Sequence, residues 1–188
     1  KINADLSLKA LSKLNNIFID SALKDNNDFA RHRCVDHYLT INTSKYLKDT
    51  DAIKAHQIYE AFIFAAQADH SLACDDRKFY YDPIKKYFLP IYNDGKSTLN
   101  IEKKDIYYKI KNSDVTENSV KGANDAIKLI SDIDDKIFFE ELVQIGFSLN
   151  FDEFKKIKKR IIDNLKALSE TEVKDNFVST PNYFENKD

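Results

Sequence analysis

Glycine, proline and cysteine are scarce in this chain of 188 residues, which contains three, three and two of them. So few glycines argue against a β-sandwich or a β-barrel, because the tight turns of those folds need residues with positive φ. Two cysteines exclude a disulfide-dense scaffold. The sequence also lacks any run of eighteen apolar residues, so we predict no membrane span.

The charges nearly cancel, with 29 Lys+Arg against 31 Asp+Glu and a formal net charge of −2. This balance gives no reason to expect nucleic acid or a charged membrane surface as a partner. A hydrophobic content of 43% is too high for a disordered chain. The length fits one domain with a core of its own.

The start of the chain bears on its cellular location. The sequence begins at Lys1 and contains no methionine. A cleaved signal peptide would explain both facts, and so would a trimmed chain. We therefore expect a secreted or periplasmic protein, with a cytoplasmic location as the alternative.

Apolar residues recur at helical spacing along most of the chain, and Asn and Asp residues stand where helix caps are expected. We predict an all-α fold, a single compact bundle of about six to eight helices, with a short irregular aromatic and proline-containing segment in mid-chain. Residues 100–111 fit a helix or a strand equally well. The predicted helices cover about residues 5–24, 29–48, 49–73, 83–90, 118–131, 135–147 and 150–170.

The domain boundaries follow from turn signals. We expect a helical domain over residues 1–170 and a polar tail over residues 171–188. The turn signal at Asn93, Asp94 and Gly95 is the clearest in the chain. It allows a division into two sub-bundles, residues 1–92 and 97–170.

Cys34 with His37, and His70 with Cys74, form two pairs at helical spacing. Two such pairs facing each other would supply the ligands of a structural zinc site. A disulfide between Cys34 and Cys74 needs only the same proximity, and it is the default for two cysteines in an exported chain. We predict this disulfide and no metal or cofactor, with two free buried thiols or the zinc site as alternatives.

A cluster of aromatic residues surrounds Pro83 and Pro90. These aromatics are too many for one core-facing stripe, and exposed tyrosines are frequent at protein interfaces. The alternative is a small satellite core beneath a long connection. The residues predicted to bind a partner are Phe79, Tyr80, Tyr81, Tyr87 and Tyr92.

The sequence shows no catalytic motif and no glycine-rich phosphate loop, and we predict that the protein is not an enzyme. The basic block Lys155–Arg160 alternates with core-facing residues, which indicates a solvated helix face.

The favoured function is a protein-interaction module, such as a small exported inhibitor, immunity or adaptor protein that binds another protein. One alternative is a carrier of an apolar small molecule, with His56, Tyr59 and His70 lining a cavity. The other is a zinc-dependent or structural-zinc helical protein.

Overall fold

The computed structural model describes residues 2–24, 49–72, 76–99 and 115–172. In these residues the chain forms five α-helices, one 3-10 helix and one antiparallel pair of strands. The prediction of an all-α bundle of six to eight helices is therefore wrong, although the fold is mostly helical. In chain order the elements are α1 (Ile2–Lys24), α3 (Thr50–Ala65), η2 (Asp69–Leu72), β1 (Lys78–Asp82), β2 (Tyr87–Ile91), α5 (Glu117–Ser131), α6 (Asp135–Gln144) and α7 (Phe151–Ser169).

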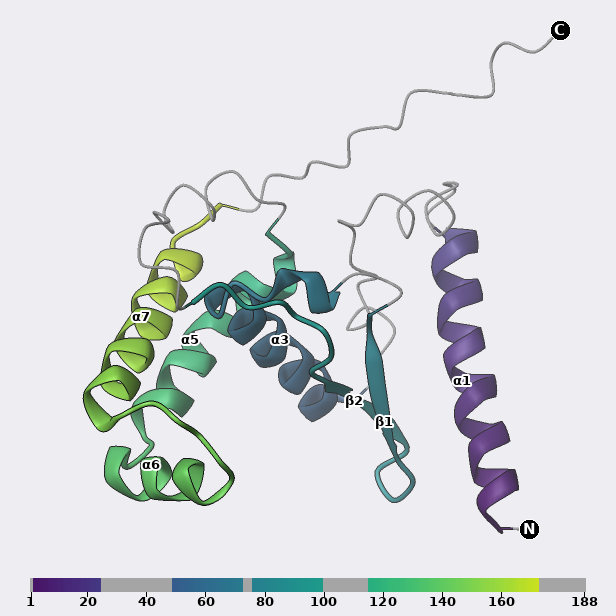
Figure 1. The fold of residues 1–188 in the computed structure, drawn as a ribbon. Helices are drawn as coiled ribbons and strands as arrows, with labels where there is room; N and C mark the ends of the chain where they lie inside the picture. Colours follow the sequence, from purple (N-terminus) through teal and green to yellow (C-terminus); the bar gives the residue numbers. More distant parts are fainter. Residues whose placement is uncertain (1, 25–48, 73–75, 100–114, 173–188) are drawn as a thin grey trace, which may run out of the picture.

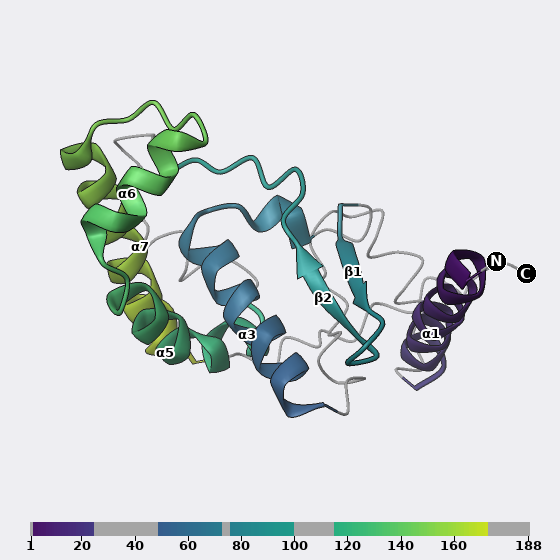
Figure 2. The same ribbon diagram turned by 90° about the horizontal axis from the view of Figure 1, so that it is seen from below.

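The core lies where α3, α5 and α7 pack together, as Figure 1 shows. The hairpin β1–β2 lies on the other side of α3, and α1 stands beyond the hairpin (Figure 2). Lys13 of α1 reaches the hairpin turn, where its Nζ donates to the carbonyl oxygen of Lys86 at 2.8 Å. The fully buried apolar residues of this core include Ala61, Ala65, Ala123, Ala126, Leu165 and Leu168.

The contact between α3 and α5 is close because small residues line it. A Cβ atom placed on Gly122 would lie 2.1 Å from the carbonyl oxygen of Gln57. Such a distance is far inside van der Waals contact, so only glycine permits this separation of the two helix backbones.

The predicted short helix after Asp82 is instead the turn of the hairpin. The Asp82 carboxylate accepts hydrogen bonds from the backbone N–H groups of Ile84 and Lys85, as a helix N-cap would. The N–H of Lys86 then bonds to the carbonyl of Asp82, and the chain reverses into β2. Asx turns and N-caps share these local bonds, which is why the sequence pattern pointed to the wrong element.

Two polar contacts attach the hairpin to α3. The Nε2 atom of His56 lies 2.8 Å from the carbonyl oxygen of Phe88. The hydroxyl of Tyr59 donates to the carbonyl of Ile91 at 3.2 Å. Burial raises the pKa of this hydroxyl above its ordinary value. Through these two contacts, the side chains of His56 and Tyr59 bridge helix α3 and strand β2.

The predicted helix boundaries agree with the structure where caps define them. Asp49 caps α3, and Asn150 and Glu153 form a capping box at the start of α7, so both helices begin where the sequence predicted them to begin. In contrast, α3 ends at Ala65 and not near residue 73. Gln67, with a φ of 52°, turns the chain away from the helix axis.

Several predictions concern parts of the chain outside the described residues. They are the helix over residues 29–48, the ambiguous segment 100–111 and most of the polar tail. The division into two sub-bundles stays a prediction. Among the described helices, none combines the length and the apolar character that a membrane span requires.

Candidate functional site

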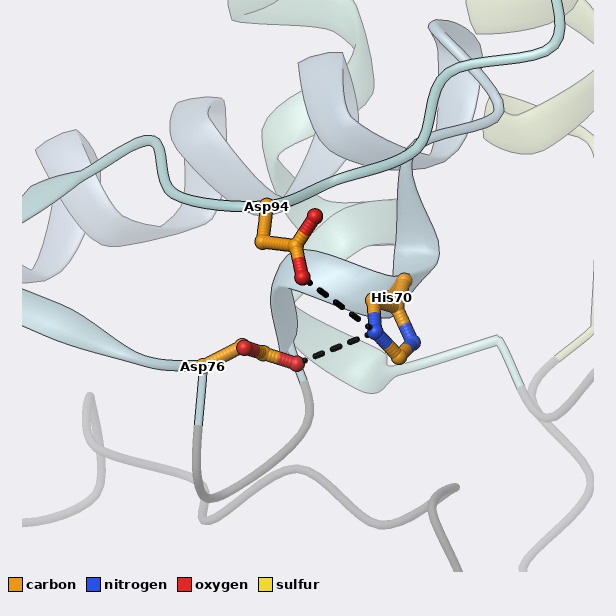
Figure 3. Close-up of side chains that lie close together, drawn as sticks. All are labelled: His70, Asp76 and Asp94. Atoms are coloured by element: carbon orange, nitrogen blue, oxygen red, sulfur yellow. Dashed lines mark ion pairs between the residues drawn. The ribbon is translucent and has the colours of Figure 1, made fainter.

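Three side chains that are potential metal ligands meet beside the hairpin. His70 lies on η2, Asp76 precedes β1, and Asp94 follows β2. The Nε2 atom of His70 is 3.2 Å from Oδ2 of Asp76 and 3.8 Å from Oδ2 of Asp94, as Figure 3 shows. One donor atom from each residue lies within 4.8 Å of the other two.

Side-chain bonds to the backbone fix the three segments relative to one another. The amide of Asn93 donates to the carbonyl oxygen of Asp76 at 3.1 Å. The hydroxyl of Ser97 donates to the carbonyl of Ala66, at the end of α3, at 2.6 Å. The loop that carries Asp94 is thus tied both to the Asp76 segment and to the turn that leads to His70.

A lysine stands at the rim of this cluster. Nζ of Lys96 is 2.8 Å from Nε2 of His70 and 3.6 Å from Oδ2 of Asp94. An ammonium has only donors, so this contact uses Nε2 as an acceptor, whereas an ion pair with either carboxylate uses a protonated Nε2; the tautomer decides between them. With an unprotonated Nε2, the imidazole nitrogen and both carboxylates are acceptors within 4.8 Å of one another, an arrangement that a positive group stabilises.

The backbone around Asp94 is unusual. Asp94 and Lys96 have φ values of 40° and 48°, in the left-handed region that non-glycine residues seldom adopt. Gly95 between them is buried, and a Cβ there would lie 2.8 Å from that of Ala68. Strained backbone of this kind costs on the order of 1 kcal/mol per residue and is concentrated at functional sites.

The spacing of the donor atoms suits a metal ion. Two ligands that each lie about 2.1 Å from a metal ion are about 3.0 to 3.4 Å apart at tetrahedral or octahedral angles. The separation between His70 and Asp76 falls in this range, and that between His70 and Asp94, 3.8 Å, exceeds it slightly. One imidazole and two carboxylates are a donor set for Mn²⁺, Zn²⁺ or Mg²⁺ that leaves coordination positions open.

A second polar cluster, centred on Glu60, lies inside the protein next to this site. The side chains of Glu60 and Arg77 are 2% and 8% exposed, and Nη2 of Arg77 donates to Oε1 of Glu60 at 3.0 Å. The hydroxyl of Thr116 donates to Oε2 at 2.7 Å.

Burial lowers the pKa of nearby His56, and its bond to Phe88 opposes this effect only in part. His56 is therefore a buried residue that bonds to strand β2.

The five aromatic residues predicted to bind a partner differ in exposure, and the alternation of side chains explains the difference only along β1. Tyr80 and Tyr92 are more than half exposed, whereas Tyr87 is buried. The ring of Phe79 stacks on His56, with centroids 5.9 Å apart, and that of Tyr81 contacts Phe88 at 5.1 Å. On β1, Phe79 and Tyr81 thus lie on the face that contacts His56 and Phe88, and Tyr80 on the other face is open to solvent. Tyr87 shares the face of Tyr80 in the register and is nevertheless buried.

The predicted cysteine chemistry concerns residues that the structure does not describe. Cys34, His37 and Cys74 lie outside the described residues, so the disulfide and the zinc alternative stay predictions. His70 is described, and its ring faces Asp76 and Asp94. Neither aspartate is among the site residues predicted from the sequence. The one available signal was the turn at Asp94 and Gly95, which marked a special backbone but no ligand.

Comparisons of this chain with protein-family models, with curated proteins and with solved structures find no match. The site geometry is therefore the basis for a functional proposal.

Proposed function

We propose that His70, Asp76 and Asp94 bind a divalent cation, and that this cation binds a phosphate-bearing ligand. The observation that carries the proposal is the convergence of three acceptor atoms from three separate segments within 4.8 Å. A divalent cation at their centre replaces the weaker interaction with the Lys96 ammonium and neutralises both carboxylates.

The incomplete coordination favours an anionic ligand. Magnesium and manganese sites with one or two carboxylates are commonly completed by water and by the phosphates of a substrate. Lys96 stands at the rim, where its ammonium would accompany a bound anion once the cation has displaced it from His70. A phosphate group between the cation and Lys96 would satisfy both positive charges.

Equilibrium dialysis with ATP, used as a soluble phosphate-bearing probe, tests this proposal. We expect retention of ATP that requires Mg²⁺ or Mn²⁺ and that Asp94→Asn reduces at least tenfold. Asp163→Asn, on the exposed side of α7, is the matched control. Retention that is independent of the metal, or equal in the Asp94→Asn variant, would contradict the proposal.

A second candidate function is the predicted protein-interaction module. It is supported by the exposure of Tyr80 and Ile91, which are 52% and 45% exposed on the outer face of the hairpin. Large apolar side chains gathered on one face are typical of protein-binding surfaces. Tyr80→Ser should leave the free energy of unfolding within about 0.5 kcal/mol of wild type and abolish binding of a captured partner. Phe88→Ser, on the buried face, is the contrasting variant and should unfold the hairpin.

A further inference from the structure

Arg77 connects the cation site to the buried cluster around Glu60. It is the residue directly after Asp76, and its side chain is 8% exposed and pairs with Glu60. Its Nε atom donates to the carbonyl oxygen of Leu72 at 3.2 Å. Leu72 ends η2, the turn that carries His70. One guanidinium therefore joins the segment of Asp76 to the segment of His70.

Glu60 fixes this guanidinium to α3. Its carboxylate accepts bonds from Arg77, from the hydroxyl of Thr116 and, at 3.4 Å, from the amide of Asn118. Together these bonds hold the carboxylate between α3 and the start of α5. The planar guanidinium is thus held through two of its donors, Nη2 to Glu60 and Nε to the carbonyl oxygen of Leu72.

The location of this ion pair is not explained by stability alone. Moving two charges out of water costs several kcal/mol per ion, and apolar side chains of similar volume often stabilise a fold equally well. What the pair provides here is a defined position: it sets the spacing between η2 and the first residues of β1. The separation of His70 and Asp76 depends on that spacing.

We infer that Arg77, held by Glu60, is the positioning residue of the cation site. It touches neither the cation nor its ligand, and it acts by setting the distance between the donor atoms of His70 and Asp76. This inference rests on the proposed function of the site. Residues that orient metal ligands typically change metal affinity by about 10- to 100-fold when they are replaced.

The test measures Mn²⁺ affinity of the full chain by EPR, beside its denaturant unfolding midpoint. Arg77→Lys keeps the charge but loses the fork of donors, and we expect it to weaken Mn²⁺ binding by about tenfold or more. Glu60→Gln and Thr116→Val loosen the same guanidinium from α3 and should weaken binding in the same direction. They keep the inference testable if Arg77→Lys does not fold.

Leu165→Ala is the control for a purely structural effect. Leu165 is fully buried in α7, and its truncation removes core packing without touching the site. We expect a lower unfolding midpoint with unchanged Mn²⁺ affinity. Wild-type affinity in the Arg77 and Glu60 variants would overturn the inference and leave the cation site standing. An equal loss of affinity in Leu165→Ala would also overturn it. Failure of the wild-type protein to bind Mn²⁺ would overturn the proposed function together with the inference.

Discussion

His56 and Phe88 join the central helix to the hairpin: Nε2 of His56 lies 2.8 Å from the Phe88 carbonyl oxygen, and the imidazole is 2% exposed. Bonding to a carbonyl oxygen requires a proton on Nε2. Because burial disfavours the charged form, the ring takes up a second proton less readily in the folded chain than in the unfolded one.

This difference predicts a stability that depends on pH. The pKa of His56 is lowered in the folded state from an ordinary value of 6.5. Above that pH neither state is protonated at this residue, and its contribution is constant. As the pH falls through 6.5, the unfolded chain binds a proton that the folded chain does not, so the free energy of unfolding decreases.

The His56→Gln variant isolates this effect, since glutamine keeps an N–H donor and does not titrate. Each unit by which the pKa is lowered corresponds to about 1.4 kcal/mol of stability lost at low pH. Urea unfolding between pH 7.5 and 4.5 measures the difference. Parallel pH profiles for the wild type and the variant would show that His56 does not cause the loss.

The contact between Gly122 and Gln57 predicts a strong effect of a single methyl group. Gly122→Ala places a Cβ against the backbone of α3, which cannot rotate away as a side chain could. We expect a loss of about 1 to 3 kcal/mol or more, although alanine has the higher helix propensity.

Asn124→Ala serves as the control, because Asn124 is exposed on the same helix. This substitution should leave the unfolding free energy unchanged or raise it slightly. Unfolding in guanidinium chloride measures the free energy of unfolding of both variants. A Gly122→Ala variant as stable as Asn124→Ala would mean that α3 and α5 are not in close contact at this point.

In the proposed cation site, Lys96 would compete with the metal ion for the lone pair of His70. Lys96→Met removes the ammonium and keeps the length of the side chain. At about 4 Å and in a solvated setting, the unfavourable interaction of this charge with a bound cation is about 1 kcal/mol per unit of cation charge. For Mn²⁺ this amounts to about 2 kcal/mol, so the affinity should rise about 30-fold.

The charge-matched control is Lys159→Met, on the exposed surface of α7. It should leave Mn²⁺ affinity unchanged, and calorimetric titration measures both variants. In contrast, Lys96→Met should weaken the metal-dependent binding of ATP. An unchanged Mn²⁺ affinity in Lys96→Met would mean that the ammonium does not occupy the position of the cation.

The sequence predicted those elements whose signals are local. The capping box of Asn150 and Glu153 and the N-cap of Asp49 rely on bonds that span three residues, and both are present. The hairpin was missed because Asp82 makes the same local bonds in a turn as it would in a cap. What separates the two outcomes is pairing with β2, which no short window of sequence contains.

The cation site could not be predicted for a related reason. His70, Asp76 and Asp94 share no spacing that one helix or strand would turn into proximity. They meet because α3 ends early, the hairpin returns the chain, and left-handed residues on both sides of Gly95 direct Asp94 toward His70. Each of these steps is a tertiary feature.

The central claim is that the imidazole of His70 is a ligand of a divalent cation, together with Asp76 and Asp94. Pulsed EPR of Mn²⁺ bound to the protein tests this claim most directly, because it detects a nitrogen nucleus coordinated to the metal. We predict a nitrogen coupling in the wild-type protein that is lost in His70→Asn and retained in His56→Gln. The absence of saturable Mn²⁺ binding, or a nitrogen coupling that persists in His70→Asn, would contradict the account.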